Sequence, residues 1–266
     1  MDYDHFLREV CPRLDLRWRK YRRRSARRRV ESRFRELGLA GFEEYCELLK
    51  RNATETAGLA DGMRVTVSRF FRERGQWDLL LDRVLPGVLA SGEPDRPFRV
   101  WSAGCCGGEE PYTLAILWLE QVSSPSHGRT LDILASDIDP DSLERASFAV
   151  YDPGTLREVP APIRDRWFVR EGPGWRLGSQ PKNMVRFVRH NLIEDPPPEG
   201  MDLVLCRYLA FTYYGGERRH RAAHRIWTAL RPQGALMIGR KEGLGPRELE
   251  LFGRWVGAEG FFRKHG

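Results

Sequence analysis

The stretch Phe98-Arg-Val-Trp-Ser-Ala-Gly-Cys-Cys-Gly-Gly-Glu-Glu-Pro-Tyr-Thr113 predicts how the centre of this chain folds. Its first apolar residues are typical of a short buried β-strand, and the glycines that follow allow the backbone to turn sharply. Glu109 and Glu110 then favour the first turn of a helix, where negative charge suits the macrodipole, and Pro111 fits the same turn. A strand, a glycine-rich turn and a helix in this order open a nucleotide-binding α/β unit.

The residues of this turn restrict the kind of ligand that it can hold. A phosphate-binding loop needs a Gly-Lys-Ser/Thr sequence, which the turn lacks, and two adjacent acidic residues would repel a phosphate. A cationic or neutral adenosine ligand suits the turn better, and S-adenosylmethionine is both a nucleoside and a cation. The alternative is an ordinary tight turn whose glutamates are solvated.

The segment from Ser102 to Ala115 resembles the cofactor loop of the CheR-type chemotaxis methyltransferases, whose usual form is Ser-Ala-Gly-Cys-Ser-Thr-Gly-Glu-Glu-Pro-Tyr-Ser. Further motifs stand in that family's order, namely Arg69-Phe-Phe-Arg-Glu73, Ala135-Ser-Asp-Ile-Asp139, Asn191-Leu192 and Leu205-Cys-Arg207. The resemblance covers most of the chain. It implies a protein-glutamate O-methyltransferase that uses S-adenosylmethionine and releases S-adenosylhomocysteine.

The fold class implied by the sequence and the resemblance is α/β. A small all-helical N-terminal domain is expected over residues 1–75, followed by a Rossmann-like methyltransferase domain over residues 76–266. Residues 151–187 interrupt the alternation of strands and helices, and a Gly-Pro-Gly turn within them predicts a short antiparallel β insertion. A helix over Pro246–Val256 and a last strand near Phe261 are expected to close the sheet.

The net charge of +7 is concentrated in one segment. Residues 17–35 hold eleven arginines and lysines against the single acid Glu31, and a long arginine-rich helix is expected there. Three roles stay open. In the first, the arginine stems simply cover apolar surface. In the second, the helix binds an acidic, glutamate-bearing protein surface, as the resemblance implies, and in the third it binds nucleic acid. Steep salt dependence is expected of the last two.

The remaining composition narrows the class of protein. No apolar run approaches the roughly 18 residues of a membrane span. Five cysteines without a CxxC pair indicate reduced thiols and a cytoplasmic location. His220 and His224 have a spacing that metals use, but no HExxH motif is present, so they are interpreted as solvated and no metal site is predicted.

The candidate cofactor-binding residues follow from strand ends and from the resemblance. An acid at the end of the second strand of a nucleoside-binding α/β fold accepts hydrogen bonds from ribose hydroxyls, and the resemblance puts that role on Asp137. Asn191 and Leu192 resemble the family's adenine-side contacts. The resemblance places the other cofactor-binding candidates at Thr66, Ser68, Arg72, Gly104, Glu110, Arg207 and Tyr208.

The chain departs from the family's pattern in two places. Thr66 stands where the family has asparagine and Ser68 where it has threonine, so hydroxyls remain but an amide donor is lost. Farther on, the family's asparagine becomes Tyr208, and the tyrosine thought to sit by the methyl group becomes Thr212, with Tyr213 one residue later. Either Tyr213 takes that position or the substrate pocket differs.

The resulting hypothesis is an enzyme that transfers a methyl group to a carboxylate. A glutamate is mostly ionised at neutral pH and needs no general base, so catalysis would rest on alignment and exclusion of water. Arg72 is expected to orient the carboxylate, unless it is simply solvated, and Thr212 and Tyr213 are the other catalytic candidates. Two alternatives stay open: a different protein or small-molecule substrate, and a non-catalytic module that binds the cofactor and signals.

Overall fold

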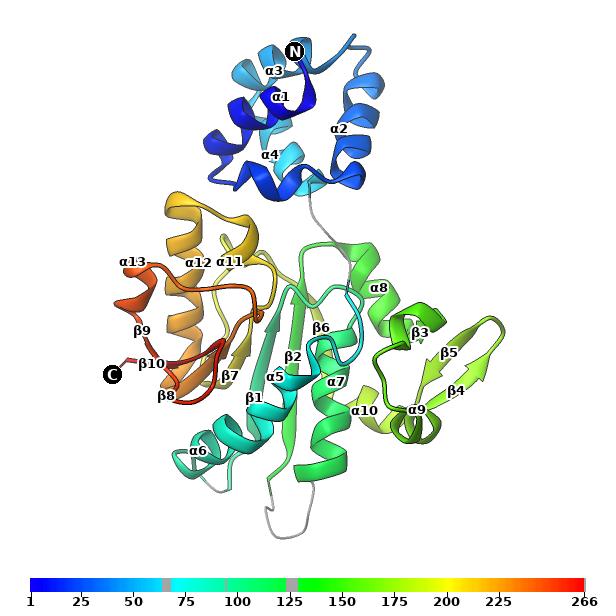
Figure 1. Ribbon diagram of the computed structural model, residues 1–266, viewed down its shortest axis with the longest axis vertical. Coiled ribbons are helices and arrows are strands. Elements are labelled where there is room, and N and C mark those ends of the chain that lie inside the picture. Colours follow the sequence, from blue (N-terminus) through cyan, green and yellow to red (C-terminus); the bar gives the residue numbers. More distant parts are fainter. Residues whose placement is uncertain (64–67, 94, 123–128, 266) are drawn as a thin grey trace. The chain divides into compact units, whose positions relative to one another are not determined.

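The structure is a computed structural model that describes residues 1–63, 68–93, 95–122 and 129–265. The chain divides into two compact units. One is formed by Met1–Val65 with Leu209–Arg221, and the other by Thr66–Tyr208 with Ala222–Gly266. Helices build the first unit, and a seven-stranded sheet organises the second (Figure 1).

The helices of the helical unit enclose an apolar core. It contains α1 (Tyr3–Val10), α2 (Arg24–Glu36), α3 (Phe42–Arg51), α4 (Ala53–Gly62) and α11 (Ala210–Tyr213), with 3-10 turns at Cys11–Leu14 and Trp18–Tyr21. In α2, Ala26, Val30 and Phe34 recur every four residues and are buried. Arg33 of the same helix binds both carboxylate oxygens of Glu55, at 2.9 and 2.7 Å, and thereby ties α2 to α4.

The expectation of one long arginine helix is wrong. The basic run is divided between the 3-10 turn Trp18–Tyr21 and α2, because the backbone leaves helical geometry at two residues between them. Arg22 has a ψ of 8°, and Arg23 is extended, with φ −77° and ψ 143°. The arginines before this break therefore cannot share a helical face with those after it.

The sheet of the second unit has the strand order β6-β2-β1-β7-β8-β10-β9. Its strands are β1 (Phe98–Ala103), β2 (Leu131–Asp137), β6 (Val185–Arg189), β7 (Met201–Leu205), β8 (Leu230–Met237), β9 (Phe252–Arg254) and β10 (Phe261–Lys264). Strands β6, β2, β1, β7 and β8 are parallel, and β10 and β9 are antiparallel additions at one edge. The chain proceeds from β1 outward to β2 and β6 and then returns to β7 on the other side of β1. The carboxyl ends of β1 and β7 therefore form the switch point at which ligands bind in such sheets.

The α/β fold class predicted from the sequence is confirmed. The helices of the sheet unit are α5 (Arg74–Leu79), α6 (Leu85–Ala90), α7 (Glu109–Leu117), α8 (Pro140–Phe148), α9 (Ala161–Trp167), α10 (Ser179–Asn183), α13 (Pro246–Leu249) and the part of α12 (Gly216–Ala229) from Ala222 onward, with π-helical turns at Leu80–Val84 and Trp118–Val122 and a 3-10 turn at Pro153–Leu156. The β insertion is a separate three-stranded antiparallel sheet of β3 (Val150–Tyr151), β5 (Gly174–Leu177) and β4 (Phe168–Glu171), beside α9 (Figure 1).

The expected helix over Pro246–Val256 is wrong in its extent. Helix α13 ends at Leu249, and the chain then forms the edge strand β9. Strand β9 pairs antiparallel with β10, and its first residue, Phe252, is completely buried. Burial of this phenylalanine in the sheet unit overrides the local preference for helix.

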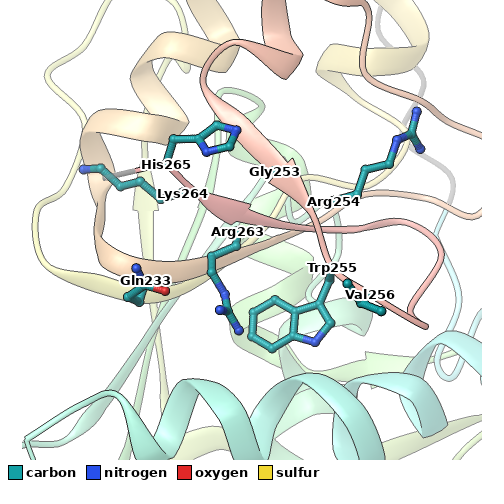
Figure 2. Close-up of a pocket in the computed structure, with 8 residues that line it drawn as sticks. All are labelled: Gln233, Gly253, Arg254, Trp255, Val256, Arg263, Lys264 and His265. Atoms are coloured by element: carbon teal, nitrogen blue, oxygen red, sulfur yellow. The ribbon is translucent and has the colours of Figure 1, made fainter.

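A basic groove of about 400 Å³ lies along this antiparallel edge (Figure 2). Arg254, Trp255, Arg263, Lys264 and His265 contribute to its lining. Its cations are already engaged: the Arg263 guanidinium stacks on Trp255 at 4.1 Å, and the Lys264 ammonium donates to a backbone carbonyl at 2.6 Å. The groove contains none of the site residues predicted from the sequence.

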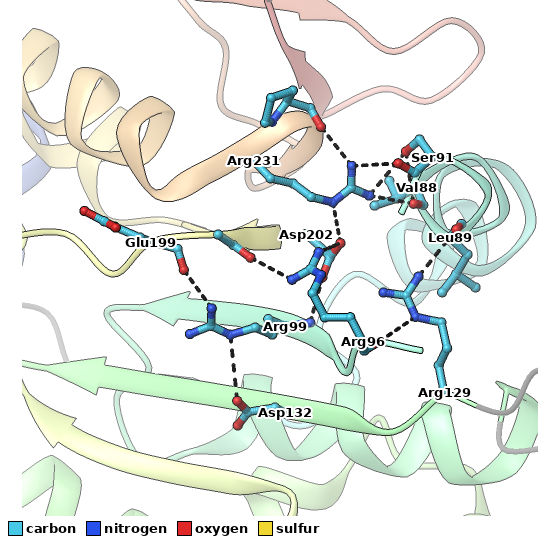
Figure 3. Close-up of polar contacts among 12 residues, drawn as sticks. Val88, Leu89, Ser91, Arg96, Arg99, Arg129, Asp132, Glu199, Asp202 and Arg231 are labelled. Atoms are coloured by element: carbon cyan, nitrogen blue, oxygen red, sulfur yellow. Dashed lines mark hydrogen bonds and ion pairs between the residues drawn. The ribbon is translucent and has the colours of Figure 1, made fainter. Parts of the chain in front are cut away.

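At the amino-terminal ends of the central strands, one buried aspartate binds several arginines (Figure 3). The side chain of Asp202, in β7, is fully buried and binds Arg96 at 2.8 Å and Arg231 at 2.5 Å. Its second oxygen accepts the backbone N–H of Arg99 at 2.9 Å. Because these partners precede β1 or begin β1 and β8, the carboxylate fixes the starts of three neighbouring strands.

Candidate active site

The turn between β1 and α7 departs from ordinary backbone geometry. Gly104, Cys106 and Gly108 all have positive φ, of 78°, 50° and 87°. A Cβ added at Gly108 would lie 3.0 Å from Tyr112 and 3.1 Å from Ala146, so this glycine allows the turn to pack directly on α7 and α8. The non-glycine Cys106 is held in its left-handed conformation by a hydrogen bond from its N–H to a carboxylate of the next strand.

That carboxylate belongs to Asp137, the last residue of β2. It is nearly buried, its Oδ2 accepts the Cys106 N–H at 2.9 Å, and its Oδ1 accepts the Asp139 N–H at 3.0 Å. Asp139 in turn caps α8 by accepting from the Ser142 N–H at 3.2 Å. A carboxylate has about four acceptor positions, so Asp137 keeps acceptor capacity for a diol such as a ribose.

A largely buried ion-pair network occupies the switch point between β1 and β7. Arg207 follows β7, and its guanidinium donates to Glu110 at 3.2 Å and to Glu73 at 3.0 Å. Glu110, in the first turn of α7, also accepts from the Ser102 hydroxyl at 3.0 Å. Burial raises the pKa of Glu110, although Arg207 and Ser102 act in the opposite direction. The network fixes the start of α7 against the segment that precedes α5.

Arg72 and Tyr208 meet beside this network. The guanidinium carbon of Arg72 lies 4.0 Å from the centre of the Tyr208 ring. The Tyr208 hydroxyl donates to Glu73. Burial is the main cause that raises the pKa of Tyr208 to about 12, and this hydrogen bond is the second. Burial alone would raise the pKa of Glu73, but hydrogen bonds from Tyr208 and the Arg240 N–H lower it below its usual value.

Glu109 is the buried acid of the turn that lacks a full set of partners. Its side chain is almost completely buried, and its Oε2 has no hydrogen-bond partner among the residues that the structure describes. Burial raises the pKa of Glu109, against the opposing influence of Arg145 and the Ser68 hydroxyl. A buried acceptor without a donor costs free energy, which makes this oxygen a candidate contact for a polar ligand.

The segment after β6 carries the predicted adenine-side residues. The Asn191 side chain accepts the Ile193 N–H at 2.9 Å, and its own backbone N–H donates to Asp195 at 2.7 Å. Leu192 is buried. The His190 N–H donates to the Asp137 carbonyl at 3.0 Å, which places this segment beside the end of β2.

The predicted site residues fall into three groups. Arg72, Gly104, Glu110, Asp137, Asn191, Leu192, Arg207, Tyr208 and the half-buried Ser68 belong to the sheet unit, around the carboxyl ends of its central strands. Thr212 and Tyr213 belong to the helical unit, where both are buried and Tyr213 packs against Tyr21 at 5.4 Å between ring centres. Thr66 lies outside the described residues.

Some residues of this site were missed by the sequence analysis. Glu73 accepts from both Arg207 and Tyr208, and Glu242 accepts the N–H groups of Tyr208 and Gly239, each at 2.7 Å. Glu73 is part of the Arg-Phe-Phe-Arg-Glu motif, so the sequence could have identified it as a site residue. Glu242 lies in the loop after β8, and its hydrogen bonds to the Tyr208 and Gly239 N–H groups show its role.

These features define an α/β protein of the nucleoside-binding class, and comparison with known proteins specifies the family. A model described as "CheR methyltransferase, SAM binding domain" matches residues 66–255, and one described as "CheR methyltransferase, all-alpha domain" matches residues 1–63. The chain belongs to the CheR methyltransferase family. It is therefore an S-adenosylmethionine-dependent methyltransferase, and S-adenosylmethionine is its cofactor.

Individual relatives differ in length. The chain is 34% identical to a chemotaxis protein methyltransferase of Listeria monocytogenes, over 91% of this chain and 89% of that protein. It is 33% identical to an uncharacterized 104.1 kDa protein of Rhodobacter capsulatus, over 84% of this chain but only 23% of that protein. Among solved structures, a TehB-like SAM-dependent methyltransferase of Corynebacterium glutamicum aligns over 73% of this chain and 94% of its own, with 16% identity and a TM-score of 0.36.

The residues present fit S-adenosylmethionine. Asp137 has acceptor capacity for the ribose hydroxyls, Glu109 has an unpaired buried oxygen, and the Arg72 guanidinium has no carboxylate partner among the described residues. Acceptors suit the hydroxyls and the cationic centre, and a guanidinium suits the α-carboxylate.

Across the parts of the chain that the structure describes, no helix is long and apolar enough to cross a membrane.

Proposed function

We propose that this protein transfers the methyl group of S-adenosylmethionine to the side-chain carboxylates of glutamates on a chemoreceptor-like partner. The proposal is supported by the names of its relatives, which are chemotaxis protein methyltransferases. The observation that carries it is Arg72: a half-buried residue whose guanidinium lies over the ring of Tyr208 and pairs with no carboxylate among the described residues. Such a group can orient a carboxylate, because arginine presents donors in a planar fork.

In this proposal the residues of the chain bind the cofactor, orient the acceptor carboxylate and exclude water. S-adenosylmethionine, when bound, supplies the activated methyl group. Asp137 holds the ribose, Asn191 and Leu192 contact the adenine, and Gly104 allows the turn to approach the nucleoside. Arg72 orients a carboxylate. The acceptor is already ionised at neutral pH, so alignment and desolvation replace a general base.

The remaining site candidates have supporting roles in this proposal. Glu110 and Arg207 brace the turn through their ion pair, while Tyr208 lines the crevice. Thr66 and Ser68 are proposed to offer hydroxyls to the cofactor, and Thr212 and Tyr213 to line the path of the methyl group. We assign partner binding to residues 1–75, methyl transfer to residues 76–266, and no tethering role to the insertion at 151–187.

The partner surface is proposed to be acidic and to contact α2. Arg24 and Arg28 are exposed, and among the described residues neither has a carboxylate partner. By contrast, Arg27 and Arg33 of the same helix are paired with Glu31 and Glu55. The exposed arginines are therefore available to a glutamate-bearing surface, and nucleic acid is the competing ligand. The free cysteines are consistent with action in the cytoplasm.

Methyl transfer can be tested with purified protein, methyl-labelled S-adenosylmethionine and a chemoreceptor cytoplasmic fragment. A glutamyl methyl ester releases labelled methanol in mild alkali, so alkali-labile label on the fragment is the expected result. Alkali-stable label would assign a different acceptor. Cofactor binding in calorimetry without turnover on any carboxylate partner would indicate a non-catalytic signalling module.

A further inference from the structure

Tyr208 stands where the family carries asparagine, and its backbone is strained. Its φ is +55°, a left-handed value that is unusual for a bulky residue. Such a conformation costs on the order of 1–3 kcal/mol and persists only where the surroundings impose it. Here the Tyr208 N–H donates at 2.7 Å to the Glu242 carboxylate, and the same oxygen accepts the Gly239 N–H.

The side chain of Tyr208 contacts Gly239, Arg72 and Glu73. A Cβ at Gly239 would lie 2.6 Å from ring atoms of Tyr208, so only a glycine at this position lets the ring lie against the end of β8. The Arg72 guanidinium stacks on the ring at 4.0 Å. The hydroxyl donates to Glu73, the residue that follows Arg72. One side chain thus contacts two consecutive residues by two different interactions.

The backbone of Arg72 is fixed independently of this contact. Its carbonyl accepts from the Trp77 indole at 3.1 Å and from Arg207 at 2.9 Å. Its side chain has no such anchor apart from Tyr208, and no carboxylate among the described residues pairs with it. An unanchored arginine loses substantial rotamer entropy when it binds an anion, and a stacked one has already lost part of it.

We propose that Tyr208 is a positioning residue that holds the Arg72 guanidinium in place for a carboxylate of the cofactor or of the substrate. This inference rests on the anion-binding role proposed for Arg72. It gives the departure from asparagine a function, because the ring contacts the Arg72 guanidinium and the hydroxyl binds Glu73, the next residue.

The test is a double-mutant cycle between Arg72 and Tyr208, measured as S-adenosylhomocysteine affinity by calorimetry. Tyr208→Gly removes the ring while accommodating the positive φ, and Tyr208→Phe keeps the ring but removes the hydroxyl. We expect Tyr208→Gly to weaken binding about threefold to tenfold, the range for a cation–π contact, and Tyr208→Phe to weaken it less than about twofold. In an Arg72→Ala background, Tyr208→Gly should cause no further loss. Additive losses would overturn the inference.

The same cycle separates the two possible sources of the carboxylate. If Arg72→Ala leaves S-adenosylhomocysteine affinity unchanged but raises KM for the receptor fragment, the substrate carboxylate is the ligand of Arg72. The double-mutant cycle with Tyr208 is then measured as KM for that fragment. If Arg72→Ala changes neither, the role proposed for Arg72 fails.

A direct readout of stacking does not depend on any ligand. The NMR signal of the Arg72 Nε–H should be shifted by the ring in the wild-type protein and in Tyr208→Phe, and should lose that shift in Tyr208→Gly. An unchanged signal in Tyr208→Gly would overturn the stacking itself, whatever the affinities show.

Discussion

The guanidinium of Arg207 donates to the carboxylate of Glu110 at 3.2 Å, and both side chains are largely buried near the carboxyl ends of β1 and β7. Removing one member of a buried pair leaves an uncompensated charge. We therefore expect Arg207→Met to lower the free energy of unfolding by about 3 kcal/mol in denaturant titration. The double variant Arg207→Met, Glu110→Gln should recover more than half of that loss. A loss in the single variant below about 1 kcal/mol would contradict the importance of the pair.

Glu109 should destabilise the fold at neutral pH. Burial raises its pKa in the folded state, so the folded protein binds this proton more tightly than the unfolded chain does. Stability should consequently fall as the pH rises from the ordinary glutamate pKa through the raised one. Glu109→Gln should raise the free energy of unfolding at pH 7 by about 1 kcal/mol and flatten this decline. The exposed Glu43→Gln serves as the control, and equal pH profiles for wild type and Glu109→Gln would refute the assignment.

Asp137 should matter for cofactor affinity more than for stability. Hydrogen bonds to a charged group contribute about 1.5–3 kcal/mol, so Asp137→Ala should weaken S-adenosylhomocysteine binding by about tenfold to a hundredfold in calorimetry. Asp132→Ala is the matched control, because it lies on the same strand at its other, exposed end. Similar affinities for both variants would show that Asp137 does not contact the ribose.

Asp202 should matter for stability alone. Its buried carboxylate holds Arg96, Arg231 and the Arg99 N–H, and Asp202→Asn would leave two guanidinium groups without their anion. We expect a loss of about 3 kcal/mol in the free energy of unfolding. Asp165→Asn, which breaks an exposed pair with Arg164, should cost less than about 1 kcal/mol. If the two variants lost equal stability, the role of Asp202 at the strand starts would have to be abandoned.

The exposed arginines of α2 should govern partner binding. Arg24→Ala with Arg28→Ala should weaken binding to a chemoreceptor fragment about threefold to tenfold and reduce its salt dependence. The pair Arg254→Ala with Arg263→Ala removes equal charge from the basic groove at β9 and β10 and should leave this binding unchanged. A loss confined to duplex DNA binding would favour the nucleic-acid alternative.

Local patterns were sufficient to predict much of the fold. The apolar run ending at Ala103 and the glycines after it predicted β1, its turn and α7, because strand and turn preferences act between near neighbours. The resemblance, and not a local pattern, assigned the acid at the end of β2 to Asp137. Local patterns failed at Pro246–Val256, where pairing with β10 turned part of an expected helix into β9.

The sequence by itself determined the class of fold and the strand, glycine-rich turn and helix that begin at Phe98, because such local elements depend on residues a few positions apart. Only the tertiary structure decided the partners of the buried charges and rings. Arg207 pairs with Glu110 across 97 positions, and the Tyr208 hydroxyl reaches Glu73 across 135. No local spacing encodes such contacts. They arise because parallel strands bring distant carboxyl ends to one edge of the sheet, where burial favours pairing between charged groups.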